Sequence, residues 1–342
     1  MSETQLPPGH PPVPTRKVGV LLMNLGTPEA TDYWSMRKYL KEFLSDRRVI
    51  ELNRLLWWPV LNIIILTFRP TKSAKAYKQI WNMERGESPL KTYTRSQSDK
   101  ISAVFSRYKN VVVDWAMRYG KPPVSERLHA LQKQGCDRIV LFPLYPQYSA
   151  ATTATALDKA YDALKTMRWQ PAIRTVPPYF DHPAYIDAIA ASLTGHIAAL
   201  DWKPDRVLMA FHGLPREYLN KGDPYHCHCQ KTARLVRERL NWSADFAQIV
   251  FQSRFGPAEW LQPYAQDTVE SLPAQGVENL VMISPGFSSD CVETLEELAI
   301  GLEETFHEKG GKNFSVVSCL NDSPPSITLL AQLVDEELKG WI

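Results

Sequence analysis

The stretch Asn279–Leu298, NLVMISPGFSSDCVETLEEL, decides the fold and points to a site. Its apolar run Leu280–Ile283 is typical of a buried strand and ends at a Pro-Gly turn. A pair of serines then precedes a helical pattern in which Asp290, Glu293 and Glu297 are spaced three and four apart. An α-helix would place these carboxylates on one face. Acids also stabilise the first turn of an ordinary solvated helix, so the row alone leaves both interpretations open.

A second stretch of the same kind is Arg206–Pro215, RVLMAFHGLP. Its apolar run ends at His212, and Gly213 follows. Open α/β sheets carry their sites at the carboxyl ends of strands, so a histidine here is a candidate base or metal ligand. We expect His212 and the carboxylate row to face each other across one cleft.

Strand-like apolar runs alternate with amphipathic segments along the chain. The runs are Val18–Leu25, Asn110–Met117, Ile139–Leu144, Ala172–Val176, Val207–Phe211, Ala247–Gln252, Leu280–Ile283 and Phe314–Cys319. The helical segments include Pro123–Gln134, Ala151–Thr166, Pro183–Leu200, Thr232–Leu240 and Ile327–Lys339. This alternation indicates βαβ units and mainly parallel sheets. It predicts an α/β protein of two similar doubly wound, Rossmann-like domains.

The division between these domains is expected near residue 168. The first domain would comprise residues 17–168 and, through a returning last helix, residues 320–342; the second would comprise residues 169–319. The first sixteen residues are rich in proline and lack the apolar core of a signal peptide, which predicts a disordered tail. No run of eighteen apolar residues occurs, so we expect a cytoplasmic protein without a spanning helix.

Composition excludes several classes of protein. A net charge of +2 without a clustered Lys/Arg stripe argues against a nucleic-acid partner. The odd count of five cysteines argues against a disulfide framework and fits a reducing compartment. Neither a GxGxxG after a strand nor a GxxxxGK[ST] is present, so no nucleotide cofactor is expected.

The run His226-Cys227-His228-Cys229 has the composition of a metal site. Adjacent residues rarely converge on one tetrahedral ion, however, and no second ligand pair stands at zinc-finger spacing. We interpret the run as a polar turn, with a zinc site as the minor alternative. Cys291 lies among the acids but at another helical angle, and we expect it to face the core.

The segment Leu55–Phe68, LLWWPVLNIIILTF, is mostly apolar and flanked by Arg54, Arg69 and Lys72. It is too short to span a bilayer. It is either a buried helix or an interfacial helix with Trp57 and Trp58 at the level of the lipid headgroups.

Aromatic residues accompany the candidate strand ends. Trp260, Tyr119, Tyr145 and Tyr148 would together line a flat apolar pocket, although single aromatics more often belong to the core.

Six motifs, in order, make the chain from about Val18 onward resemble ferrochelatase of the bacterial type. They are MNLGTPE (Met23–Glu29), FPLYPQYS (Phe142–Ser149), FHGLP (Phe211–Pro215), GDPY (Gly222–Tyr225), FQSRFGPAEWL (Phe251–Leu261) and GFSSDCVETLEEL (Gly286–Leu298). The resemblance implies a chelatase-like fold with a porphyrin cleft between two similar domains. It also implies a lyase that inserts Fe²⁺ into protoporphyrin IX to give protohaem.

The resemblance assigns roles to particular residues. The active-site histidine falls on His212 and the metal-side glutamate on Glu293, with Asp290 and Glu297 behind it, so these four are the expected metal-handling residues. The porphyrin-lining positions fall on Leu25, Arg118, Tyr119, Tyr148 and Trp260. Leu55–Phe68 lies where the family has the hydrophobic lip of its cleft, which predicts peripheral docking on the inner face of the membrane.

The chain also departs from the family pattern. Some members hold a [2Fe–2S] cluster with cysteines near the middle of the chain and in a C-terminal extension. Here Ala150 and Ala151 occupy the central region and the sequence stops at Ile342, so we expect no cluster and no other cofactor. Cys291 stands where the family often has histidine, which removes a potential ligand.

Metal insertion requires the loss of two pyrrole protons, for which His212 is the expected acceptor, while the acids guide the metal or carry protons away. A cobalt chelatase of the same superfamily and a non-catalytic porphyrin or haem carrier remain alternatives. A row of buried carboxylates disfavours a carrier, because burying unused charge costs stability. The sequence leaves open protoporphyrin against coproporphyrin, and also the oligomeric state.

Overall fold

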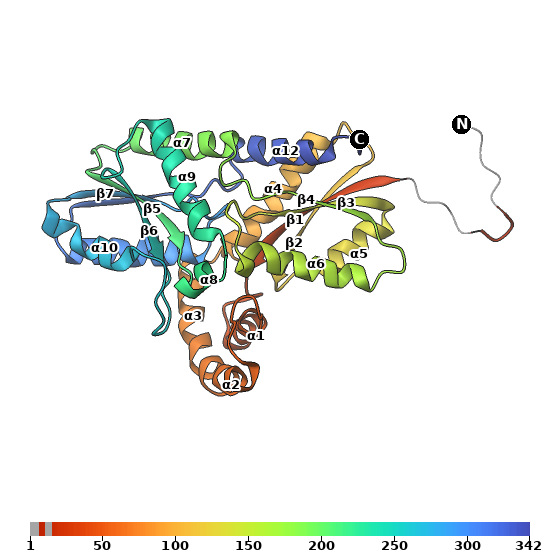
Figure 1. Ribbon diagram of the computed structural model, residues 1–342, viewed down its shortest axis with the longest axis horizontal. Helices are drawn as coiled ribbons and strands as arrows, with labels where there is room; N and C mark the ends of the chain where they lie inside the picture. Colours follow the sequence, from red (N-terminus) through yellow and green to blue (C-terminus); the bar gives the residue numbers. More distant parts are fainter. Residues whose placement is uncertain (1–6, 11–15) are drawn as a thin grey trace.

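Two four-stranded parallel sheets form the frame of the molecule (Figure 1). The computed structural model describes residues 7–10 and 16–342. The first sheet has the order β2-β1-β3-β4, with β1 (Lys17–Gly26), β2 (Val111–Tyr119), β3 (Cys136–Pro143) and β4 (Ala172–Thr175). The second has the order β6-β5-β7-β8, with β5 (Arg206–His212), β6 (Ala247–Gln252), β7 (Asn279–Ile283) and β8 (Asn313–Val317). The predicted strands and the two doubly wound halves are confirmed.

Helices cover both sheets. In the first half these are α1 (Tyr33–Leu44), α2 (Arg54–Pro59), α3 (Leu66–Ile80), α4 (Pro89–Phe105), α5 (Val124–Lys133) and α6 (Thr155–Lys165). In the second half they are α7 (Pro183–Ala198), α8 (Arg216–Asn220), α9 (Tyr225–Leu240), α10 (Ala265–Ser271), the 3₁₀ turn η3 (Pro273–Gln275), α11 (Glu303–Glu308) and α12 (Pro324–Leu338). Three segments are π-helical: η1 (Val60–Ile65), η2 (Ala150–Ala154) and η4 (Glu293–Leu302).

Strand β1 is apolar from Val18 to Met23 because helices cover both faces of its sheet. Successive side chains of a strand point to opposite faces. Val20 and Leu22 accordingly join one core, and Leu21 and Met23 join another core beneath α5 and α6.

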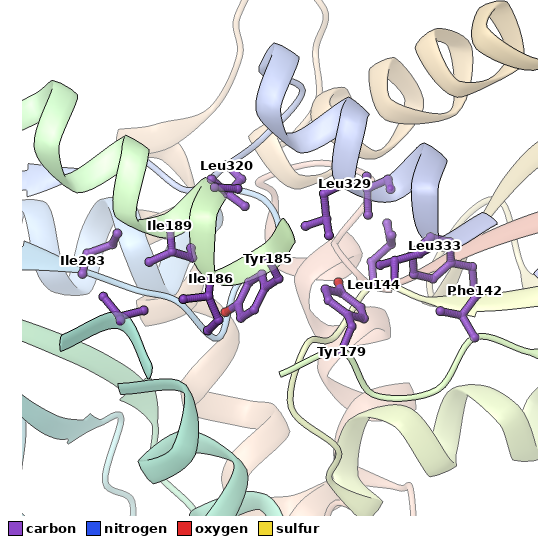
Figure 2. Packing of buried hydrophobic residues seen from close by; sticks show 14 of the residues in the cluster. Phe142, Leu144, Tyr179, Tyr185, Ile186, Ile189, Ile283, Leu320, Leu329 and Leu333 are labelled. Atoms are coloured by element: carbon purple, nitrogen blue, oxygen red, sulfur yellow. The ribbon is translucent and has the colours of Figure 1, made fainter. Parts of the chain in front are cut away.

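One core is common to both halves of the molecule. Each sheet contributes one of its faces to this core. Helices α7 and α12 cover the core from the same side (Figure 1). Figure 2 shows Ile189 of α7, Leu329 and Leu333 of α12 and the rings of Tyr179 and Tyr185 meeting at this junction. The two sheets are therefore held against one another by a continuous apolar layer.

The sequence placed the division between the domains after residue 168. Strand β4 pairs with β3, with Ile173 opposite Ile139, so the first sheet continues to Thr175 and that boundary falls too early. Helix α12 returns to the first half, where it packs on α4 and β3, but it also packs on α7. The tail predicted for residues 1–16 lies mostly outside the described residues.

Helices α1, α2 and α3 project from the first sheet on the side away from α7 and α12 (Figure 1). They enclose a small core of their own, in which the indole N–H of Trp57 donates to the carbonyl of Leu44 at 2.8 Å. Within residues 7–10 and 16–342, no helix combines the length and apolar character needed to cross a bilayer.

The carboxyl ends of β1 and β2 touch, and Gly26 makes this possible. Its φ is +111°, and a Cβ atom there would lie 1.8 Å from the carbonyl oxygen of Tyr119. A side chain at Gly26 would therefore force the two strand ends apart.

We expect Gly26→Ala to destabilise the protein by about 3 kcal/mol or more, through backbone strain and the clash with Tyr119. The control is Gly195→Ala in α7, where a Cβ atom meets nothing within 4 Å. That change should stabilise by roughly 0.5–1 kcal/mol, because alanine is the better helix former. Urea unfolding of both variants measures the difference, and a Gly26→Ala protein as stable as wild type would contradict the argument.

Candidate functional site

His212 is the last residue of β5, where it lies between β6 and β7 at the carboxyl edge of the second sheet. Its Nδ1 lies 2.6 Å from the carbonyl oxygen of Gly213. A carbonyl only accepts hydrogen bonds, so Nδ1 carries the proton of the neutral ring. Nε2 is then unprotonated and available to accept a proton or to bind a metal ion.

Gly213 brings the strand ends and an aromatic ring together beside this histidine. Its N–H donates to the carbonyl of Gln252 at 2.8 Å. A Cβ atom at Gly213 would lie 2.7 Å from that oxygen and 3.1 Å from Cε3 of Trp260. The indole of Trp260 thus packs directly on the residue after His212, and its buried Nε1 has no hydrogen-bond partner in the described part of the chain. The predicted site residues His212 and Trp260 therefore both lie against Gly213, one as its chain neighbour and one by packing.

Glu297 is the carboxylate that hydrogen bonds connect to Gln252 and Ser253, at the end of β6 beside His212. It accepts from the backbone N–H of Ser253 at 2.7 Å and from the Ser253 hydroxyl at 2.5 Å. Burial raises the pKa of Glu297, and the Glu293 charge raises it further; the Ser253 hydrogen bonds and the His212 charge oppose this. Glu297 therefore lies within the electrostatic field of both His212 and Glu293.

Glu293 begins the π-helix η4, and its carbonyl accepts from the Gln252 side chain at 2.9 Å. Burial raises the pKa of Tyr77 in α3 and of Tyr39 in α1, and the Glu293 charge adds to both shifts. Burial lowers the pKa of Arg69, and Glu293 opposes that shift. Glu293 therefore faces the projecting helices α1 and α3 from the second half of the molecule.

The prediction of an α-helix for this segment is wrong. A π-helix bonds i to i+5, so residues three apart do not stack as they would in an α-helix, and Asp290 lies before the helix begins. π-Helical turns are rare and occur frequently at functional sites. Of the other two π-helical segments, η1 follows α2 and η2 precedes α6.

Asp290 serves the fold of the second half. Its carboxylate accepts from the Cys319 N–H at 3.1 Å, from the Thr294 hydroxyl at 3.0 Å and from the Asn321 side chain at 2.6 Å. Its prediction as a metal-handling residue on the face of Glu293 is therefore not matched. Cys291 is buried, as expected, and burial raises its pKa.

The predicted metal-handling residues do not form a ready-made chelate. Within the described ranges, no group of three or more His, Cys, Asp or Glu side chains has the arrangement needed to hold a metal ion. His212, Glu293 and Glu297 are brought into one region, and Asp290 is directed elsewhere.

The porphyrin-lining positions divide into two sets. Leu25 and Tyr148 are partly exposed, and the Tyr148 N–H donates to Nδ1 of His228 at 3.2 Å. Tyr119 has no exposed surface, so it cannot line an open cleft as predicted. The Arg118 side chain is only 11% exposed and pairs with Asp46. Asp46 carries no sequence signal, because it lies in a turn 72 residues from its partner.

The run His226–Cys229 begins α9 and does not form a turn, which corrects that interpretation. His228 stacks on Phe180 with ring centroids 3.7 Å apart. Cys229 is buried and Cys227 is exposed, so the four side chains point in different directions. The arrangement does not support a zinc site.

Comparison with known proteins identifies the family. The ferrochelatase family model matches residues 17–338. The chain belongs to the ferrochelatase family. It is 59% identical to the ferrochelatase of Rhizobium meliloti (strain 1021) over 333 residues, which cover 97% of this chain and 98% of that protein. It is 57% identical to the ferrochelatase of Agrobacterium fabrum (strain C58 / ATCC 33970) over 337 residues, covering 98% of each. The resemblance predicted from the six motifs is confirmed.

Solved structures of a chelatase with low sequence identity have the same fold as this chain. SirB from Bacillus subtilis with Fe³⁺ superposes with a TM-score of 0.54 at 10% identity, covering 94% of this chain and 95% of that one. The sirohydrochlorin chelatase SirB of Bacillus subtilis subspecies spizizenii in complex with cobalt gives a TM-score of 0.54 at 9% identity, covering 94% and 96%. The predicted chelatase-like fold is confirmed.

The raised pKa of Glu297 makes stability depend on pH. The native state binds this proton more tightly than the unfolded state. The proton therefore stabilises the native state in full below the ordinary glutamate pKa, and this stabilisation is lost as the pH rises through the raised native pKa. Glu297→Gln removes that loss. We therefore expect the stability of Glu297→Gln relative to wild type to increase between about pH 5 and about pH 8.

Urea unfolding midpoints at both pH values measure this effect. Glu308→Gln, at an exposed position that ends α11, is the control and should follow the wild-type pH profile. Parallel profiles for Glu297→Gln and wild type would contradict the assignment.

Proposed function

We propose that the protein inserts Fe²⁺ into protoporphyrin IX and releases protohaem, the terminal step of haem synthesis. The observation that carries the proposal is His212 at a strand end in a member of the ferrochelatase family, with Nδ1 directed to the Gly213 carbonyl and Trp260 packed on Gly213. Glu297 lies within the field of both His212 and Glu293. The reaction takes one ferrous ion and one free-base porphyrin and yields the iron porphyrin and two protons. Iron keeps its oxidation state, so no redox partner is required.

The first task of the site is to accept pyrrole protons. Nε2 of His212 has a free lone pair because Nδ1–H is committed to the carbonyl of Gly213. A proton on His212 gives a charge that favours the ionised form of Glu297. Burial raises the pKa of Glu297, which suits it to take up a proton and pass it onward.

The second task is to receive the metal. Glu293 offers a hard oxygen donor, which suits a divalent ion that must lose its water shell. Without a preformed chelate, the carboxylate binds the ion weakly and can release it to the porphyrin nitrogens. Trp260 supplies a flat apolar surface for the macrocycle beside His212.

We also propose that the protein works without an iron–sulfur cluster. A cluster needs four suitably placed ligands. Cys136 lies in β3 and Cys227 and Cys229 in α9, while Cys291 and Cys319 are buried beside Asp290. No four of these five thiols lie in one segment or on one surface.

An assay with purified protein, protoporphyrin and Fe²⁺ or Zn²⁺ tests the proposal. Loss of the free-base spectrum and appearance of the metalloporphyrin spectrum supports it. Porphyrin binding without conversion would favour the carrier, and conversion of a more carboxylated tetrapyrrole with cobalt alone would favour a cobalt chelatase.

His212→Ala should reduce metal insertion at least 100-fold, about the typical contribution of a general base, while porphyrin binding persists. The matched control is His307→Ala: His307 also directs Nδ1 to a backbone carbonyl, at 3.1 Å, but lies in α11 away from the strand ends. Initial rates and porphyrin-induced tryptophan quenching provide the two measurements. Retention of more than about a tenth of the activity by His212→Ala would refute the role.

We propose in addition that the protein docks peripherally on the inner membrane face. The supporting observation is an exposed apolar surface that we call the lip patch. It consists of Leu52, just before α2, and of Leu55, Leu56, Trp58, Ile63, Ile64 and Phe68 on α2, η1 and α3, each more than half exposed. Trp57, Leu61 and Leu66 on the same segment are buried. One face of the segment is thus buried in the core, and the other face is exposed to solvent. Lys72 and Lys75, both exposed, follow it and suit anionic headgroups.

Trp58→Ser combined with Ile64→Ser should lower partition to anionic liposomes by about tenfold, because both exposed side chains would lose their contact with lipid. Trp57 is not used, since it is 7% exposed and bonded to Leu44, and its loss would destabilise the fold. Trp169→Ser, at an exposed tryptophan after α6, is the control and should leave partition unchanged. Equal partition of wild type and the double variant would remove the argument for a membrane face.

A further inference from the structure

The carboxylate of Asp46 lies in the turn after α1, at the base of the projecting helices, and its side chain is 8% exposed. Its Oδ2 accepts from the Tyr119 hydroxyl at 2.9 Å, from the Thr155 hydroxyl and from Nη2 of Arg118. Its Oδ1 accepts from the backbone N–H of Arg48 at 2.8 Å. One carboxylate therefore joins this turn to the end of β2 and the start of α6.

These contacts fix the guanidinium of Arg118. Nε donates to the Thr155 hydroxyl at 2.7 Å, and the guanidinium carbon lies 4.2 Å from the centroid of the Tyr119 ring. Charge-assisted hydrogen bonds and a cation–π contact together define both its position and its plane. Arg118 is positioned at the carboxyl edge of the first sheet, next to the end of β1.

Asp46 stays ionised in this position. Burial would raise its pKa, but the hydrogen bonds from Thr155 and the Arg48 backbone and the charge of Arg118 outweigh burial and lower it. Arginine remains protonated in proteins. The pair is thus a neutral unit made of two permanent charges.

The same turn also contacts the second half of the molecule. The Tyr218 hydroxyl donates to the carbonyl of Val49 at 2.9 Å, and Lys221 pairs with Glu51 at 2.9 Å. Tyr218 lies in α8, which begins four residues after His212. Residues 46–51 therefore touch the wall that carries Arg118 and the element that follows His212.

We propose that Asp46 is a positioning residue for metal insertion, which orients Arg118 and cancels its charge so that an incoming divalent cation meets a neutral wall. This rests on the proposed function. An unpaired guanidinium at the strand edge would repel Fe²⁺ over roughly a Debye length, about 10 Å at moderate ionic strength. It would not repel a porphyrin, whose carboxylates are anionic.

The test is a double-mutant cycle of Asp46→Asn and Arg118→Gln with separate Michaelis constants for metal and porphyrin. Asp46→Asn keeps the shape of the side chain and removes its charge. We expect the metal KM, for Fe²⁺ and for Zn²⁺, to rise by about tenfold at low salt and by less at high salt. The porphyrin KM should not rise. A merely structural loosening would raise the porphyrin KM and would not depend on salt.

The double variant should return the metal KM to about the wild-type value, because neither charge of the pair then remains. Asp158→Asn is the matched control: Asp158 pairs with Arg48 nearby but is 48% exposed, and its loss should leave the metal KM unchanged. If Asp46→Asn fails to fold, Arg118→Gln alone decides. It leaves Asp46 unpaired, so the metal KM should fall below the wild-type value, and an increase overturns the proposal.

The remaining outcomes separate the two proposals. An active wild type with an unchanged metal KM in Asp46→Asn, or a metal KM in the double variant as high as in Asp46→Asn, overturns the role of Asp46 alone. A wild type that inserts neither metal overturns the proposed function, and the role of Asp46 falls with it.

Discussion

The site depends on the close pairing of β5 with β6 at Gly213 and Gln252. The N–H of Gly213 reaches the Gln252 carbonyl at 2.8 Å, and the Gln252 side chain continues to the carbonyl of Glu293 at 2.9 Å. A larger residue at Gly213 would separate these strand ends, because its Cβ atom would meet both Gln252 and Trp260. One close approach thus fixes the histidine, the indole and the start of η4 relative to one another.

The shared core explains why this arrangement holds across two halves of the chain. Met209 and Phe211 of β5 point into the same apolar layer as Leu22 of β1 and Phe142 of β3. Burying each such side chain contributes roughly 1.5–3 kcal/mol. This stabilisation offsets the unfavourable features at the strand ends, which include a partly buried glutamate and an indole N–H without a partner in the described residues.

Much of this could be predicted from the sequence, because apolar runs and strand-end residues are local signals. The eight runs gave the strands, and the placement of His212 after one of them gave the histidine. The carboxylate row was only partly predictable, since a spacing of three and four assumes an α-helix and nothing in the sequence marks η4 as a π-helix. Asp290 fits the spacing, yet its oxygens are used by Asn321 and Cys319, about 30 residues further along the chain.

The burial of neighbouring residues with the same side chain also could not be predicted from the sequence. Trp57 and Trp58 are indistinguishable in the sequence, but the first is buried and the second is 64% exposed. Which one turns inward depends on the packing of Trp57 under the end of α1, where it finds the Leu44 carbonyl. Asp46 is a further case, because its partners come from β2 and α6 and only the folded chain brings them together.

The two sides of the site differ in charge, and this difference affects the order in which protons leave and metal ions enter. The wall of the second half carries Glu293 and Glu297 beside His212, whereas on the first half Arg118 and Asp46 cancel. Under the proposed function, a divalent cation would be drawn to the acidic wall and neither drawn to nor repelled by the other. Once His212 holds a proton, its positive charge opposes a second cation at that wall, so the proton must pass to an acid before another ion can approach. Glu297, whose pKa is raised by burial and which lies within the field of His212, is placed to accept it. Proton removal and metal entry would then alternate at one wall.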